Sequence, residues 1–346
     1  MDGTRQQLPA IQPIQNYLTY LENIEKSPNT VRNYAHHLKL FFEFLESSGI
    51  TWTQVDLKDI AEFIYWLRSP EPGVTALQQQ ESKRCERTVN LIISAVSSFY
   101  EYQNGLGEVP DLPLYRYQMQ PRKYKNFLYH ISKSKPVKNS KLKLKERKLT
   151  PETLSQFQVI QLIDACENIR DKFLIQLLYE TGMRIGQALG LRHEDIISWD
   201  NEIQIVPRLD NINGARAKTN QVNRLTVSME LMGLYTEYLV QELNDIDSDY
   251  VFVNLFQGEI GKPMNYSSVL SLFKRLSKKV GFDVHAHMLR HTHATELIRD
   301  GMGLEWVQKR LGHASVQTTI DTYAHLSHED LTHKLESFLE RNRKDK

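Results

Sequence analysis

The residues best suited to chemistry lie between positions 285 and 326. Arg290 stands there among several histidines, His313 follows a Leu-Gly pair, and Tyr323 comes soon afterwards. A basic, histidine-rich pocket with a tyrosine as its nucleophile suits phosphoryl transfer on a nucleic-acid backbone. Single residues of these types are usually solvated or paired, so their order and spacing carry the prediction.

Two arginines from separate segments, Arg184 and Arg290, could hold the reacting phosphate. The transition state at a phosphodiester carries more negative charge than the ground state. The guanidinium fork binds two phosphate oxygens at once and keeps its proton. These two residues therefore form a candidate clamp on the non-bridging oxygens.

Proton transfer needs further groups. The hydroxyl of Tyr323, with an ordinary pKa of about 10, is a poor nucleophile until a neighbour accepts its proton, and His287 is the obvious acceptor. His313 can donate a hydrogen bond to the phosphate. Lys218, on a turn, can protonate the leaving 5′-oxygen, although it could equally be one more exposed lysine.

The same residues have ordinary structural interpretations. Arg184 could cap a helix or pair with Glu180, and Tyr323 could be a core aromatic with its hydroxyl paired. His287 and His291 could bind a metal, but no Cys or carboxylate lies at ligand spacing, and we expect no metal and no cofactor. For any single residue the structural interpretation competes with the catalytic one. For the ordered set of residues it does not.

Composition indicates a soluble, globular, two-domain protein. The 346 residues are 25% charged and 40% hydrophobic, and no apolar run approaches the roughly 20 residues that span a bilayer. No apolar signal segment is present at the N-terminus, so we expect a cytoplasmic, nucleoid-associated protein without membrane partners. Cys85 and Cys166 are too few for a disulfide framework, and both are expected to be buried, reduced thiols.

The near-neutral net charge of +1 hides one strongly basic segment. Residues 106–150 hold twelve Lys and Arg against three Asp and Glu, interleaved with aromatic residues. Such a segment fits a strap over DNA, where neutralised phosphates release counterions, or else a merely soluble linker. We predict domains at 1–105 (helical, DNA-binding), 106–148 (basic linker) and 149–346 (catalytic).

Hydrophobic periodicity predicts a mainly α fold with a small antiparallel β-sheet. Pro151 is expected in the first turn of a helix. The only strand-like region is expected between 202 and 227. The expected helices cover about 28–47, 56–67, 86–102, 155–167, 169–181, 230–243, 265–280, 288–300, 303–312 and 328–341, and the expected strands 202–207, 214–219 and 224–227.

These motifs resemble the tyrosine recombinases, or phage-integrase family, whose fingerprint is Arg, Lys, His-x-x-Arg, His/Trp and Tyr. The resemblance covers about 149–341 strongly and 10–105, which is similar to the family's helical core-binding domain, more weakly. An integrase or transposase of a mobile element is the nearest branch. The residues that match the fingerprint are Arg184, Lys218, His287, Arg290, His313 and Tyr323.

The resemblance implies a site-specific recombinase acting in integration, excision or transposition. Two domains would close as a C-shaped clamp on double-stranded DNA, and Tyr323 would form a 3′-phosphotyrosyl link that a 5′-hydroxyl reverses. A homo-tetramer on two recombination sites, joined by the C-terminal helix, and possible accessory recombination proteins are also implied. The apolar stripe of 329–340 fits such docking, or packing on its own subunit.

One residue departs from the family pattern. Gln187 stands three positions after the first arginine, where the family usually has an acidic residue. An amide can hydrogen-bond but cannot balance the charge of Arg184, so we expect reduced or retuned activity. Two other functions are compatible with these residues. One is a type IB topoisomerase, which shares this catalytic set, and the other is a catalytically silent DNA-binding regulator.

Overall fold

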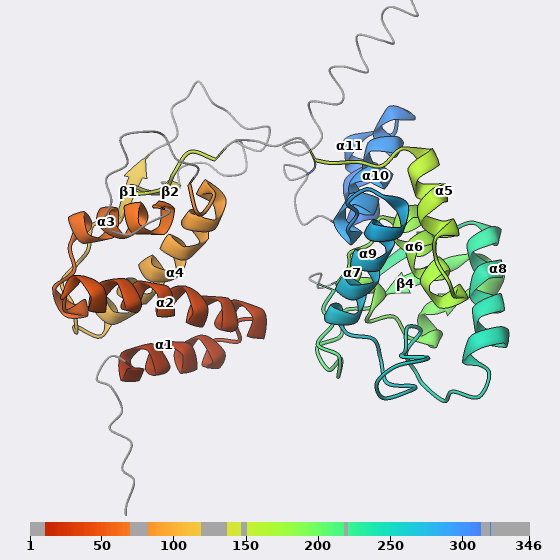
Figure 1. Ribbon diagram of the computed structural model, residues 1–346, viewed down its shortest axis with the longest axis horizontal. Coiled ribbons are helices and arrows are strands. Elements are labelled where there is room, and N and C mark those ends of the chain that lie inside the picture. The colour runs from red at the N-terminus through yellow and green to blue at the C-terminus, as the bar shows by residue number, and fades with distance from the viewer. Residues whose placement is uncertain are drawn as a thin grey trace, which may run out of the picture. The chain divides into compact units, whose positions relative to one another are not determined.

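The computed structural model describes residues 11–69, 82–118, 137–146, 151–217, 221–312 and 319. The chain divides into two compact units, Met1–Lys148 and Leu149–Lys346, here called the N-terminal and C-terminal units (Figure 1). Within the described ranges, no helix combines the length and the apolar character that crossing a bilayer requires. The expected helix at 328–341 lies outside the described residues.

The N-terminal unit is built on four helices. They are α1 (Ile11–Asn23), α2 (Pro28–Ser48), α3 (Leu57–Arg68) and α4 (Glu86–Gly105), with a 3₁₀ turn at Trp52–Gln54. Helix α2 packs against all three others. The core is largely aromatic and aliphatic, and its fully buried side chains include Tyr17, Leu38, Phe41, Ile60, Phe63, Leu67, Ile92 and Phe99.

Local sequence signals set the ends of these helices. The hydroxyl of Ser27 accepts from the backbone N–H of Thr30 at the start of α2, and Gly49 ends that helix at φ 66°. Asp56 and Asp59 form a reciprocal capping box at the start of α3. The apolar positions of each helix therefore face one core.

A two-stranded sheet follows, which the sequence did not predict. Strands β1 (Tyr115–Gln118) and β2 (Val137–Ser140) pair antiparallel, so the expectation of strands only between 202 and 227 was wrong. The chain after β2 returns to α4, where Asn90 bonds both the N–H and the C=O of Leu144. About half of the basic segment 106–150, namely 119–136 and 147–150, lies outside the described residues.

The C-terminal unit is organised around α6. Its side chains Phe173, Leu174, Ile175, Leu177 and Leu178 are all buried, and the helix packs against α5, α8 and α10. The helices of this unit are α5 (Gln156–Asp164), α6 (Ile169–Thr181), α7 (Ile185–Ala188), α8 (Met229–Tyr238, continued by a π-helical turn at Leu239–Leu243), α9 (Tyr266–Val280), α10 (Ala286–Arg299) and α11 (Leu304–Leu311).

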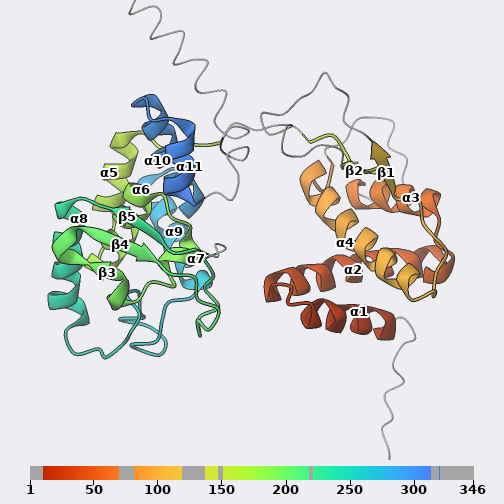
Figure 2. The same ribbon diagram turned by 180° about the vertical axis from the view of Figure 1, so that it is seen from behind.

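A three-stranded antiparallel sheet lies on the face turned toward the viewer in Figure 2. Its strands are β3 (Ile196–Ile197), β4 (Glu202–Ile205) and β5 (Asn223–Thr226), with β4 in the middle. The mainly α class with a small antiparallel sheet is confirmed, but the expected strand at 214–219 was wrong over its described part, 214–217.

Side-chain amides explain why 214–217 does not join the sheet. Asn211 donates to the carbonyl of Ala215 at 3.0 Å, and Asn213 accepts from its N–H at 3.1 Å. Asn213 also donates to the carbonyls of Leu189 and Met264. These contacts pair backbone groups that a strand would have paired through a ladder.

Two smaller expectations were also wrong. Residues 151–155 precede α5, because Ser155 and Gln158 form its capping box, so Pro151 is not in a helix. Cys166 is buried, but Cys85 is exposed at the N-cap of α4.

Candidate active site

Three of the six candidate catalytic residues fall within the described chain. Arg184, His287 and Arg290 are placed by the structure, whereas Lys218, His313 and Tyr323 lie outside the described residues. The described part of the site therefore consists of the two arginines and the histidines of α10.

The end of α6 leads directly to Arg184. Gly182 closes the helix in the left-handed conformation (φ 62°), and Arg184 occupies the N-cap position of α7. The backbone N–H of Arg184 donates to the side-chain oxygen of Gln187 at 2.7 Å. Gln187 is 4% exposed, so this departure from the family pattern still supports the turn that presents Arg184.

Arg290 lies on α10 and is almost fully buried, at 4% exposure. Its Nη1 donates to the carbonyl of Gly182 at 2.6 Å and its Nη2 to the carbonyl of Leu311 at 3.0 Å. Both carbonyls lie at helix C-termini, where the backbone carries partial negative charge. Arg290 therefore joins the ends of α6 and α11.

Arg184 reaches the same end of α11. Its Nη1 donates to the carbonyl of Gly312 at 3.3 Å, and Gly312 caps α11 at φ 62°. Burial lowers the pKa of Arg184 from its ordinary value, but a guanidinium stays protonated at neutral pH. The two candidate clamp residues thus contact consecutive carbonyls, Leu311 and Gly312, immediately before position 313.

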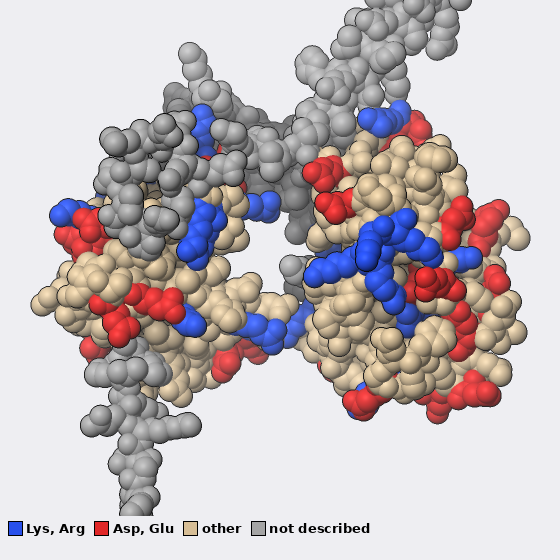
Figure 3. All heavy atoms as spheres, in the orientation of Figure 1, with Lys and Arg blue, Asp and Glu red and all other residues tan. Residues whose placement is uncertain are grey.

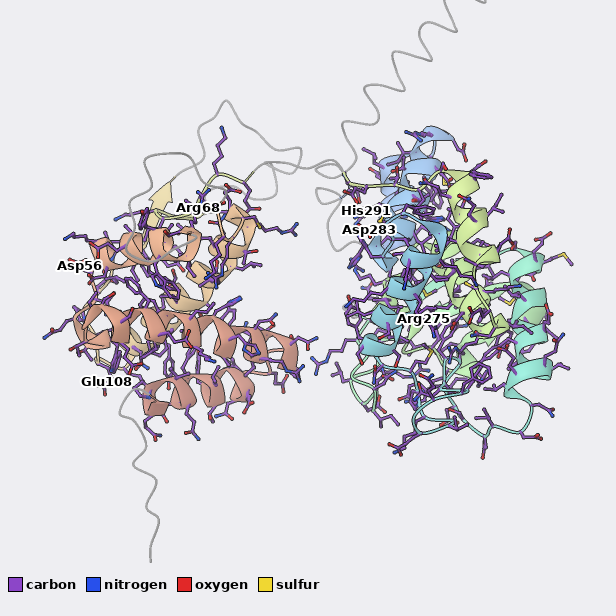
Figure 4. All side chains as sticks on the ribbon, viewed as in Figure 1. Asp56, Arg68, Glu108, Arg275, Asp283 and His291 are labelled. Carbon is purple, nitrogen blue, oxygen red and sulfur yellow. The ribbon has the colours of Figure 1, made fainter. Side chains whose placement is uncertain are left out.

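The histidines of α10 differ in how far they are exposed to solvent. His287 is exposed on the first turn, and its ring centroid lies 6.4 Å from that of His285. His291, labelled in Figure 4, is half-buried, and its pKa is lowered to about 4 by burial and then by His287, Arg290 and His285. His291 is therefore neutral at physiological pH.

Two ordinary interpretations can be compared with this geometry. Arg184 does not take Glu180 as its partner, because the Glu180 carboxylate accepts from the N–H and the hydroxyl of Ser228. For the metal interpretation of His287 and His291, the described chain contains no group of three or more His, Cys, Asp or Glu that could hold an ion.

The segment that leads to position 218 runs beside α7. A Cβ placed on Gly186 would lie 2.7 Å from the carbonyl oxygen of Arg216, so only glycine allows this approach. The loop therefore passes over the first turn of α7 at Gly186, two residues after Arg184.

The sequence reasoning missed two residues of this region, His293 and Arg310. Arg310 Nε donates to His293 Nε2 at 3.0 Å, and Arg310 Nη2 donates to the carbonyl of Glu180 at 3.0 Å. In the sequence nothing separates Arg310 from the neighbouring Lys309, which is exposed. A basic residue in the last turn of a helix is common, so no sequence signal identified the pair.

The sequence of this chain matches known protein families and known proteins. The chain matches the family model described as Phage integrase family over residues 152–330, and the one described as Phage integrase, N-terminal SAM-like domain, over residues 14–104. It is 45% identical over 333 residues to Transposase A from transposon Tn554 of Staphylococcus aureus, covering 96% of this chain and 92% of that protein.

The chain is also similar to a more distant relative and to a solved structure. Tyrosine recombinase XerA of Pyrococcus horikoshii is 27% identical over 306 residues, covering 88% of this chain and 86% of the relative. A solved structure of the Tn1549 transposon integrase in complex with a circular intermediate DNA has a TM-score of 0.66 at 16% identity. The alignment covers 96% of this chain and 100% of that one, and shows a shared fold.

Proposed function

We propose a residue-level mechanism of DNA strand cleavage and rejoining for this chain, which belongs to the phage integrase family and is a tyrosine recombinase. The proposal rests above all on one observation. Arg184 and Arg290, which come from different helices, both donate to the carbonyl groups that end α11. In the sequence, residue 313 follows directly after Gly312, which supports the proposal that His313 acts with these two arginines.

The two arginines hold and stabilise the reacting phosphate. Both guanidinium groups donate to backbone carbonyls, which fix the planes of both forks. Arg184 is only half-buried, and in this proposal its guanidinium N–H groups that bond no carbonyl of the described chain bind non-bridging oxygens. Charge that develops in the transition state then meets cations that need little reorganisation.

The remaining roles follow the fingerprint. Tyr323 attacks the phosphorus, forms a 3′-phosphotyrosyl link and releases a 5′-hydroxyl. His287, exposed on the first turn of α10, accepts the phenol proton, and His313 donates to the phosphate. Lys218 protonates the leaving oxygen. Attack by a 5′-hydroxyl of the partner strand restores the backbone, so the bond energy is conserved without a cofactor.

The substrate in this proposal is double-stranded DNA at two recombination sites, as in transposition by an element of the Tn554 type. The Tn1549 integrase, which shares the fold, is bound to DNA in its solved structure. Helix α9 offers a basic face for phosphates, and Figure 3 shows it as a band of blue on the C-terminal unit. The exposed side chains of this face are Lys274, Arg275, Lys278 and Lys279.

Part of the basic face is engaged within the protein. Arg275, labelled in Figure 4, lies 3.7 Å from Asp171, and Lys279 lies 3.3 Å from Glu167. Lys274 and Lys278 are one turn apart on the exposed side, as two phosphate contacts would require. Replacing both with alanine should weaken binding to all DNA sequences alike and reduce the salt slope by about 2.

A homo-tetramer on DNA, joined by the C-terminal helix, completes the proposal, with accessory recombination proteins as possible additions. The helix itself lies outside the described residues. Phe157 and Ile160 on α5 are 68% and 56% exposed, and they offer an apolar surface of the kind that a docking helix covers. Removal of residues 328–346 should leave DNA binding but abolish synapsis of two sites.

Covalent trapping tests the mechanism. Wild type and Tyr323→Phe are incubated with a nicked duplex carrying the ends of the mobile element, and denaturing gels report the adduct while gel shifts report binding. We expect an adduct in wild type alone, with both proteins binding equally. Binding without an adduct in either protein would indicate the silent regulator, and relaxation of any supercoiled plasmid would indicate the topoisomerase.

The arginine roles are tested on the same substrate. Arg184→Ala should slow adduct formation by roughly 10³-fold or more, since a transition-state arginine is worth that much in phosphoryl transfer. Arg299→Ala removes an exposed arginine from the last turn of α10 and serves as the matched control. Equal rates in the two variants would remove Arg184 from the clamp.

A further inference from the structure

The last turn of α6 is tied to two other helices by arginines. Arg290 of α10 donates to the carbonyl of Gly182, and Arg310 of α11 donates to the carbonyl of Glu180 at 3.0 Å. Arg310 Nη2 also lies 3.2 Å from the carbonyl of Thr226 in β5. One guanidinium thus bridges α11, α6 and the sheet.

A buried histidine completes this connection. His293, 7% exposed, lies three residues after Arg290 on α10 and accepts from Arg310 Nε at 3.0 Å. Because a guanidinium can only donate, the imidazole must be neutral with an unprotonated Nε2. The backbone of Tyr179 is a further hydrogen-bond partner of the same ring.

Within the described chain, α11 packs through a small apolar cluster. The helix contributes two buried side chains, Val307 and Leu311, to a small cluster with Ala294 and Ile298 of α10. Apolar contacts are non-directional, whereas a hydrogen-bonded fork sets both distance and orientation. At the end of α11, Arg290 contacts the carbonyl of Leu311 and Arg184 that of Gly312, which lie one and two residues beyond Arg310.

We propose that Arg310, held by His293, is a positioning residue that fixes the end of α11 against α6, and thereby the separation of Arg184 and Arg290. This inference rests on the proposed function, since it concerns the geometry of the same site. Arg310 acts through the backbone, because its partners in the described chain are His293 and the carbonyls of Glu180 and Thr226. Gly182 lies between α10 and α11, because a Cβ there would be 2.6 Å from the His293 ring and 2.8 Å from Leu311.

The first test separates DNA binding from chemistry. Arg310→Met is compared with wild type for gel-shift affinity and for the rate of adduct formation on the nicked duplex at saturating protein. We expect a rate loss of roughly 10²-fold, the usual effect of a displacement near 1 Å, with affinity within about threefold. Lys309→Met removes the same charge one residue earlier, from an exposed side chain over Trp306, and should match wild type.

The second test separates positioning from stability. His293→Gln keeps an oxygen that can accept from Arg310 and should retain most of the rate, whereas His293→Leu should not. The double variant Arg310→Met/His293→Leu removes the donor and the acceptor of this bond together, so neither is left buried without the other. We expect it to resist urea at least as well as His293→Leu, while adduct formation stays as slow as in Arg310→Met.

Three outcomes would overturn the inference. They are equal adduct rates in wild type and Arg310→Met, recovery of the rate in the double variant, and a loss of affinity as large as the loss of rate. Absence of an adduct in wild type would overturn the proposed function itself. Because wild type is measured on every gel, the two failures are distinguishable.

Discussion

Replacing His293 with glutamine should flatten the acid dependence of the stability of the C-terminal unit. The imidazole is buried, accepts from Arg310, and lies near the second cation Arg290. Burial first, and then these two arginines, lower its pKa from 6.5 to about 3. The neutral ring is therefore the form that the fold requires.

The sign and size of the effect follow from the proton uptake of the two states. Below pH 6.5 the unfolded chain protonates His293, whereas the folded chain does so only near pH 3. Stability is therefore fully present above pH 6.5 and falls as the pH drops from 6.5 toward 3. At about 1.4 kcal/mol per pH unit, one such histidine costs about 2 kcal/mol between pH 7 and pH 5.

The chain offers a probe that reports on the C-terminal unit. Met183, Met232, Met264 and Met288 are all buried in its core. Peroxide oxidises a buried methionine only after the unit opens. Oxidation of these residues against urea concentration, followed by mass spectrometry of the full chain, gives its free energy of unfolding at each pH.

We expect wild type to lose about 2 kcal/mol more than His293→Gln between pH 7 and pH 5. His285→Gln, which removes an exposed histidine from the start of α10, should keep the wild-type slope. Identical slopes in wild type and His293→Gln would show that His293 is not held neutral, and the hydrogen bond from Arg310 would have to be abandoned.

Other predictions concern single contacts. Gly182→Ala should cost about 2–5 kcal/mol, because the left-handed backbone is strained and the new Cβ meets a buried ring. Gly281→Ala, also left-handed but with no atom within 4 Å of the Cβ, should cost only about 1–2 kcal/mol; equal losses in the oxidation assay would exclude the clash. Gln187→Glu should raise the rate of adduct formation several-fold by balancing the charge of Arg184, and an unchanged rate would contradict that role. Asn90→Ala should release the chain after β2 from α4, measured as faster amide hydrogen exchange there, and unchanged exchange would show that other contacts hold it.

The sequence alone determined the family, the helical class and most helix boundaries. Those features depend on signals within a few residues, such as the Asp56 capping box of α3 and the left-handed Gly49 after α2. The catalytic fingerprint is likewise a matter of order along the chain. It named Arg184 and Arg290, and the structure places both at the end of α11.

The tertiary structure decided what these residues contact. The sequence from position 214 predicted a strand. In the structure, the side chain of Asn211 bonds the backbone of this segment instead, and the side chain of Asn213 bonds carbonyls of distant segments. Arg310 looked like Lys309 in the sequence, and only the approach of α6 and α10 partly buries Arg310 while Lys309 stays exposed. Burial and charge pairing depend on packing between segments far apart in the chain, which local periodicity does not encode.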